Sequence, residues 1–155
     1  MYIFSLTLTK EKIAAVLAIL LIITVGVVYF FPNRTSGQED KFLIKNTNEG
    51  RIKFIRSFGW EVDNKLFSKE IIRVPSEFDK GYSDYEKLQN AQGLSLLPYK
   101  NKQVTKYTYR VLNYKDSSLA VYINLFVYNN RVIAADLNSP DLKNGFIDTI
   151  MKVEK

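Results

Sequence analysis

The chain has 155 residues, 46% of them hydrophobic, and a formal net charge of +6. This length suits a single domain. The absence of histidine and cysteine from the sequence excludes an imidazole base, a thiolate nucleophile, a disulfide and a lipidated cysteine anchor, and it argues against the usual soft metal sites.

Residues 13–31, IAAVLAILLIITVGVVYFF, carry no charge. As a helix this run would reach roughly 28 Å, close to the hydrocarbon thickness of a bilayer. The run is longer than the apolar part of a typical signal peptide, and it ends in bulky aromatic residues where a cleavage site needs small ones. The sequence therefore predicts an uncleaved transmembrane signal anchor.

The basic residues Lys10 and Lys12 precede this run, and Arg34 follows it close to acidic neighbours. The positive-inside rule then places the amino-terminal tail in the cytoplasm. We expect four parts in chain order, with the last on the outer side of the cell membrane: a short cytoplasmic tail (1–12), the anchor (13–31), a linker (32–46) and an extracytoplasmic domain (47–155).

A first helix is predicted to begin near residues 46–48, which are candidate caps, with Glu49 completing a capping box on Asn46. Gly59 follows the last residue of the helical pattern, where helices commonly end. Trp60 then opens a short alternating stretch typical of a strand. We expect Trp60 to anchor the core; a ligand-binding role is the alternative.

Residues 71–75, IIRVP, have the composition of a strand that ends at proline. Ser76 and Asp79 then have the spacing of a capping box, and a second helix is expected to end at Gly93. One face of this helix would carry aromatic and aliphatic side chains, those of Phe78, Tyr82, Tyr85 and Leu88.

From residue 103 onward the apolar residues alternate with period two, which predicts antiparallel strands near residues 103–114, 120–128 and 132–137. Asn129 and Asn130 suit the tight turn between the last two strands. The expected fold is α+β: two helices packed on one face of a mostly antiparallel sheet of about four to five strands, including a C-terminal three-strand meander.

Four residues are candidates for an interaction site. Besides Trp60, the face of the first long strand that carries Lys106 and Arg110 could contact an anion. Asp136 lies in the apolar strand VIAADL, where a carboxylate needs a partner; we expect a backbone amide, a lysine or an arginine. The aromatic–basic stretch KYTYR could stack nucleic-acid bases, but an extracytoplasmic domain meets little nucleic acid, so core or partly exposed sheet positions are expected there.

The stretches RIKFIRSFGWEV, VPSEFDKGYSDYEKLQNAQGLSLLPYKNKQVTKYTYRVLNY and LFVYNNRVIAADL, followed by NGF, resemble the DUF4830 family of clostridia and their relatives. The resemblance spans about residues 48–148. It implies a membrane-anchored or exported domain in Gram-positive bacteria and brings no known activity or catalytic residues. Family members often have glycines where this chain has Ala134 and Ala135, and a glycine in place of Asn101, which weakens the idea of a glycine-lined ligand loop.

These observations favour a non-catalytic, membrane-tethered binding module at the cell envelope, without a cofactor or a metal. Its partner would be a protein, a peptide or an anionic envelope polymer, and not a nucleic acid. One alternative is a hydrolase that uses carboxylates or a serine–lysine pair; another is an accessory or regulatory subunit of a membrane complex.

Overall fold

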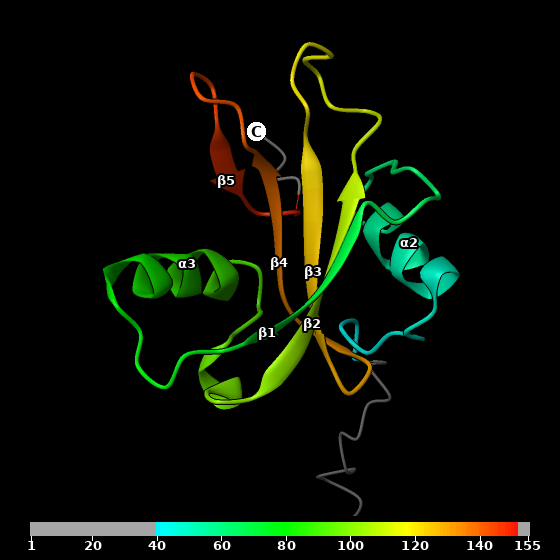
Figure 1. Cartoon of the computed structure of the whole chain (residues 1–155). Coiled ribbons are helices and arrows are strands. Elements are labelled where there is room, and N and C mark those ends of the chain that lie inside the picture. Colours follow the sequence, from blue (N-terminus) through cyan, green and yellow to red (C-terminus); the bar gives the residue numbers. More distant parts are fainter. Residues whose placement is uncertain (1–39, 152–155) are drawn as a thin grey trace, which may run out of the picture. The chain divides into compact units, whose positions relative to one another are not determined.

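The computed structural model describes residues 40–151, and the predicted anchor at residues 13–31 lies outside them. The described part is an α+β domain built on a five-stranded antiparallel sheet whose strands follow the chain order (Figure 1). The elements, in order, are α2 (Asn48–Arg56), β1 (Ser68–Arg73), α3 (Lys80–Asn90), the 3-10 helix η1 (Leu97–Tyr99), β2 (Gln103–Arg110), β3 (Tyr122–Tyr128), β4 (Arg131–Ser139) and β5 (Phe146–Asp148). No helix in this part of the chain is long and apolar enough to cross a membrane.

Helix α2 is capped by one of the three predicted residues, although not by Asn46 of the expected capping box. Thr47 is the N-cap, and its hydroxyl accepts a hydrogen bond from the Gly50 N–H at 3.2 Å. The helix ends before Gly59, which adopts φ +80°. A side chain is strained in this left-handed conformation, so a glycine suits the position. The residues that follow form only an isolated bridge, Val62 to Val111, in place of the expected strand.

Helix α3 is capped by an aspartate side chain at its start and is followed by a glycine at its end. Asp79 is the N-cap, and its carboxylate accepts a hydrogen bond from the Tyr82 N–H at 2.8 Å. The helix therefore begins three residues later than the Ser76 cap predicted from sequence. Gly93, with φ +78°, follows the last turn as predicted.

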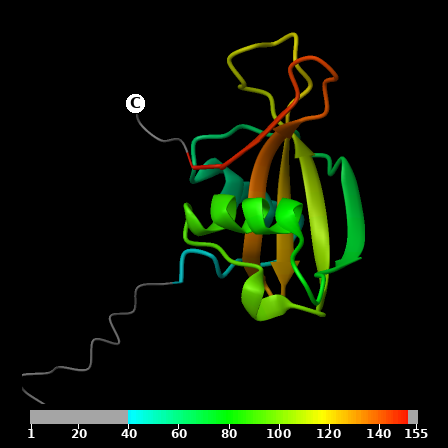
Figure 2. The same ribbon diagram turned by 90° about the vertical axis from the view of Figure 1, so that its left-hand side faces the viewer.

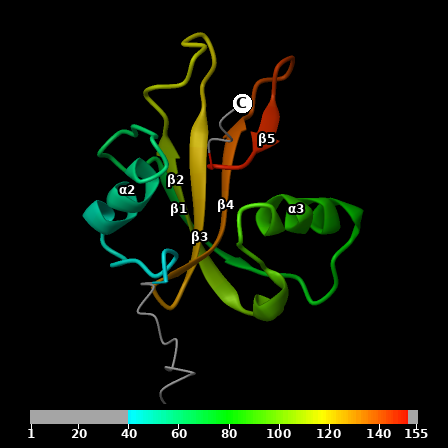
Figure 3. The ribbon, with the colours of Figure 1, turned by 180° about the vertical axis from the view of Figure 1, so that it is seen from behind.

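The two helices pack on opposite faces of the sheet, so the prediction that both cover one face is wrong (Figures 2 and 3). Leu125 of β3 packs in a cluster with Ile52 and Ile55 of α2. The next residue, Phe126, contacts Tyr85 of α3, with ring centroids 6.1 Å apart. Because successive side chains of a strand point to opposite faces, these contacts place α2 and α3 on different sides.

The larger core lies on the α2 face and the smaller one on the α3 face. Tyr107 and Tyr109 belong to the larger core, as the alternation of β2 predicts, and Ile123, Leu125 and Val127 join them from β3. Residues 40–46, which the sequence assigns to the linker, also contribute: Phe42 is buried, and its carbonyl accepts from the Val132 N–H at 2.8 Å. The folded domain therefore includes this segment.

Candidate functional site

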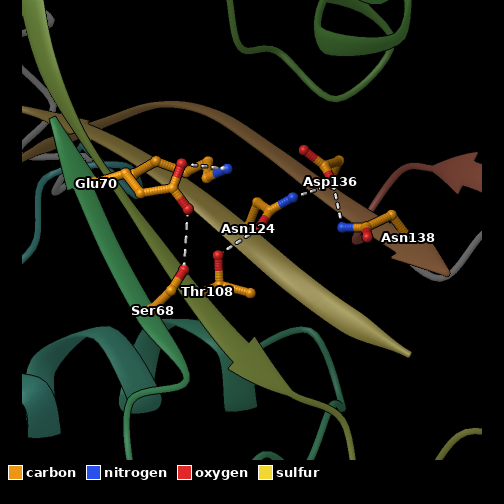
Figure 4. Close-up of polar contacts among 7 residues, drawn as sticks. Ser68, Glu70, Thr108, Asn124, Asp136 and Asn138 are labelled. Atoms are coloured by element: carbon orange, nitrogen blue, oxygen red, sulfur yellow. Dashed lines mark hydrogen bonds and ion pairs between the residues drawn. The ribbon is translucent and has the colours of Figure 1, made fainter. Parts of the chain in front are cut away.

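A cluster of polar side chains occupies the middle of the α3 face. Pairing in the sheet places Thr108 opposite Asn124, and Asn124 opposite Asp136, so side chains from β2, β3 and β4 form one line across the strands. Figure 4 shows these side chains with Asn138, one step further along β4. With Tyr85 of α3 they form what we call the polar cluster: Tyr85, Thr108, Asn124, Asp136 and Asn138.

Hydrogen bonds in the polar cluster converge on the Asp136 carboxylate. Asn124 and Asn138 donate to Oδ1 at 3.0 and 2.8 Å, and the Tyr85 hydroxyl donates to Oδ2 at 2.7 Å. The Thr108 hydroxyl in turn donates to the Asn124 amide oxygen at 2.8 Å. These partners differ from the expected backbone amide, lysine or arginine: three neutral side-chain donors hold the carboxylate.

Burial controls the ionisation of this cluster. Asp136 is only 3% exposed, and the loss of hydration raises the pKa of its carboxyl, while the donated hydrogen bonds and the Lys106 charge lower that pKa in part. The pKa of the Tyr85 hydroxyl is raised well above its usual value by burial and by the neighbouring Asp136 charge. A tyrosine in this state is a hydrogen-bond donor and a poor nucleophile.

An apolar pocket of about 400 Å³ opens beside the polar cluster, between α3, β1 and β3. Ile72, Tyr82, Tyr85 and Phe126 line most of its mouth, with Val74 and Leu96 deeper, and Asp79 and Gly81 complete the lining. Tyr85 belongs to both features, because its ring lines the pocket and its hydroxyl binds Asp136. The pocket and the polar cluster therefore adjoin each other at Tyr85, and we call the two together the α3-face groove.

Of the candidate residues predicted from sequence, Asp136 lies in this groove, and Lys106 lies on the same face of the sheet, opposite Glu70 and Phe126. The Lys106 ammonium pairs with Glu70 at 3.1 Å, and its side chain is 24% exposed. Arg110 lies on the same face of β2, opposite Tyr122 and exposed to solvent, at the edge of the groove.

Trp60, the fourth candidate, packs on the α2 side. Its indole N–H donates to the Ile150 carbonyl at 2.7 Å, and its ring stacks on Tyr114 with centroids 6.3 Å apart. At 8% exposed it anchors the C-terminal segment to the core, which is the first of its two predicted roles. The structure does not bring Trp60 together with Lys106 and Asp136.

Tyr85, Thr108, Asn124 and Asn138 were not among the functional candidates predicted from sequence. One signal was available: Asn124 and Asp136 interrupt apolar strands, and antiparallel pairing of the last two strands brings such positions opposite each other. The contribution of Tyr85 depends on helix docking, which strand alternation does not encode.

The two alanines that stand where family members often have glycine are both fully buried in β4. The Ala135 N–H donates to Gln89 Oε1 at 2.8 Å, and its carbonyl accepts from Gln92 Nε2 at 2.6 Å. Two amide side chains of the α3 region thus occupy the edge of β4 in the way a neighbouring strand would. This position serves packing, and no ligand loop is formed there.

Chemically, the groove offers a hydrophobic cavity beside hydrogen-bonding amides and a carboxylate. Within residues 40–151, no group of three or more acidic, histidine or cysteine side chains could hold a metal ion. The features present suit recognition of a ligand that has both an apolar group and polar groups.

Comparison with known proteins places the chain in a family but adds no activity. No curated protein and no solved structure matches. The model of one family, described as a domain of unknown function (DUF4830), matches residues 54–137. This match covers more than half of the chain and includes β1, β2, β3 and all but the last two residues of β4. The chain belongs to the DUF4830 family.

Proposed function

We propose that this protein is a non-catalytic binding module, tethered to the outer side of the cell membrane by residues 13–31, and that its ligand binds in the α3-face groove. The observation that carries the proposal is the contact between the apolar pocket and the polar cluster at Tyr85, whose ring lines the pocket and whose hydroxyl donates to Asp136. An anchored domain of this kind would present the groove to proteins, peptides or polymers of the cell envelope.

A peptide or protein segment fits the groove better than an anionic polymer does. The carboxylates of Asp136 and Glu70 both lie on this face, and the Lys106 charge is already paired with Glu70. A phosphate-rich chain would gain little there, whereas peptide amides can bond to asparagine side chains and an apolar side chain can fill the pocket.

Membrane topology can be tested by cysteine labelling, because the natural sequence has no cysteine. Leu142→Cys introduces a thiol at a fully exposed position of the domain, and Ser5→Cys introduces one in the predicted cytoplasmic tail. A membrane-impermeant maleimide should label the first variant in intact cells and the second only after lysis. Labelling of Ser5→Cys alone in intact cells would contradict the proposed orientation.

Ligand binding in the groove can be tested by photo-crosslinking in the full-length chain. A benzophenone amino acid replaces Tyr82, which is 37% exposed at the pocket, or Leu142, which is fully exposed and does not line the pocket. Cells that produce the protein naturally should give a defined adduct from position 82 and none from position 142. Adducts from both positions in equal amount, or from neither, would contradict the proposal.

Hydrolysis is the second candidate function, because a buried carboxylate with a raised pKa beside a pocket is a common feature of active sites. Such an enzyme would lose turnover of envelope substrates on Asp136→Asn, while the Tyr82 adduct would persist. The binding role is favoured because the Asp136 carboxylate is held by three neutral donors and the nearby Tyr85 hydroxyl is a weak nucleophile.

A further inference from the structure

The outer edge of β1 has the features of a docking site for an extended peptide. β1 lies at the end of the sheet, and no strand within residues 40–151 pairs with its far side. We propose that an acidic–apolar peptide segment adds to this edge as a further antiparallel strand and places one side chain at the mouth of the apolar pocket. This inference rests on the proposed binding function and names its class of ligand.

Backbone geometry shows which groups are available for such pairing. In an antiparallel pair, the N–H and C=O groups of successive residues point alternately toward the partner strand and away from it. Just beyond β1, in the same register, the Val74 N–H donates to the Lys102 carbonyl at 3.0 Å, so the even-numbered residues of β1 face β2. The outward-facing backbone groups therefore belong to the odd-numbered residues: Lys69, Ile71 and Arg73.

Side chains along this edge specify the partner's chemistry. Ile71 is 72% exposed on the α2 face, between the cations Lys69 and Arg73 on the same face. A partner strand with acidic residues opposite the two cations and a β-branched residue opposite Ile71 would complement this row. Cross-strand charge pairs of this kind set register and orientation.

The other face of the same strand leads into the groove. Ile72 lines the apolar pocket, and Glu70, one step along that face, pairs with Lys106. A partner residue opposite Ile72 would point to the pocket side, where Tyr82 is also partly exposed. Peptides that add to a sheet edge gain affinity from backbone hydrogen bonds and specificity from such pockets.

A second copy of this chain fits the edge poorly. If two β1 strands pair antiparallel about Ile71, each Lys69 lies opposite the other copy's Arg73. If they pair about Glu70, two carboxylates lie opposite each other. Like charges directly opposite are destabilising, so the charge pattern of β1 disfavours self-pairing in these two registers and favours an acidic partner.

The test uses a fluorescent peptide, acetyl-EFVTE-amide, whose residues would lie opposite residues 73, 72, 71, 70 and 69 in that order. Fluorescence anisotropy with the purified full-length chain should show saturable binding. A peptide with lysines in place of both glutamates should bind at least about tenfold more weakly, which corresponds to roughly 1.4 kcal/mol. Equal binding of the two peptides, or no binding of either, would overturn the proposal.

A backbone variant separates strand addition from other binding modes. Ile71→Pro removes an outward N–H that the sheet's own ladder does not use, and prolines are tolerated at such edge positions. It should weaken the peptide about tenfold or more, whereas the matched control Ile71→Thr, which keeps the N–H, should stay within about threefold. Equal affinities of Ile71→Pro and wild type would contradict edge pairing.

Two further measurements keep the outcomes distinct. A peptide N-methylated at its central valine leaves the protein unchanged and should also bind about tenfold more weakly; unchanged affinity would overturn the proposal. Sedimentation that shows a dimer abolished by Ile71→Pro would identify a second copy as the occupant instead. Failure of the peptide experiments leaves the Tyr82 crosslink as the independent test of the groove.

Discussion

Asp136 illustrates how a single buried side chain connects the fold to the groove. It pairs opposite Asn124 across the two central strands and accepts a hydrogen bond from α3 through Tyr85. Because the carboxylate is held almost entirely away from water, its ionisation costs free energy that the three donors offset only in part.

The first prediction concerns the pH dependence of stability. The pKa of Asp136 is raised above its usual value of 3.8 in the folded state, so the folded protein binds this proton more tightly than the unfolded chain does. The stability contributed by the protonated form is complete at low pH and is lost as the pH rises through the folded-state pKa. The unfolding free energy of wild type minus that of Asp136→Asn should therefore fall as the pH rises from about 4.

The control for that experiment is Asp116, a carboxylate whose pKa is shifted in the opposite direction, below its usual value. Hydrogen bonds from the Ser118 hydroxyl and N–H lower the pKa of the exposed Asp116. Its stabilisation is present above the unfolded-state pKa and is lost at lower pH, so the difference between wild type and Asp116→Asn should rise with pH. Urea titrations over a pH series measure both differences. The same slope for the two variants would contradict the assignment for Asp136.

The second prediction concerns Gly59, whose φ of +80° ends α2. Gly59→Ala should lower the unfolding free energy by about 1 kcal/mol, because alanine is strained in this conformation. The matched control is Gly81→Ala in the first turn of α3, where an added methyl group meets only Asp79 Oδ1, at 3.5 Å. That variant should be neutral or more stable by up to about 1 kcal/mol. Thermal melts that show equal losses for both would refute the role of Gly59.

At the scale of the elements, helix α3 supplies many of the side chains on one face of the sheet. Its fully buried residues are Glu86 and Gln89, while Phe78 and Tyr85 of the expected aromatic stripe pack against the smaller core and are only partly buried. Gln89, together with Gln92 just after the helix, bonds to β4, while Tyr82 and Tyr85 line the pocket. The aromatic side chains that indicate a core-facing helix thus form the wall of a groove.

The third prediction tests this docking. Gln92 bonds to the Ala135 carbonyl and accepts from the Ile150 N–H at 3.2 Å. Gln92→Ala should cost about 2–4 kcal/mol, because it leaves two buried backbone groups without these partners. Gln103→Ala, at an exposed position of β2, should change stability by less than about 0.5 kcal/mol. Denaturant unfolding distinguishes the two; a loss below 1 kcal/mol for Gln92→Ala would show that α3 docks by other contacts.

Much of the element order was predictable from sequence for clear physical reasons. Period-two alternation located the strands β2, β3 and β4 and assigned Tyr107 and Lys106 to opposite faces of the sheet. A glycine after a helical pattern marked the end of each helix. The opposite placement of the two helices was not predictable, because a helix pattern shows which side is apolar but not which face of the sheet it covers. The polar cluster was not predictable for the same reason, because it depends on how α3 docks on the sheet. The Tyr85 hydroxyl bonds to Asp136, which lies 51 residues away in the sequence.

At the scale of the whole molecule, the proposed anchor and the proposed ligand site would serve one function. The anchor would hold the domain at the outer surface of the membrane, and the α3-face groove with the β1 edge would receive a segment of an envelope protein or peptide. Two larger cavities, of about 610 and 790 Å³, open beside Trp60. The carboxylates that line them, Asp63 and Asp148 included, belong to exposed residues, whereas Asp136 is buried.

Hydrogen–deuterium exchange of the full-length chain in native membrane vesicles, compared with the purified protein, tests most directly whether the groove is the ligand site. Bound ligand should slow exchange in peptides that cover β1 and the first turns of α3, residues 68–74 and 79–85, and should leave α2 unchanged. Slowed exchange confined to α2, or no difference between the two preparations, would contradict the account.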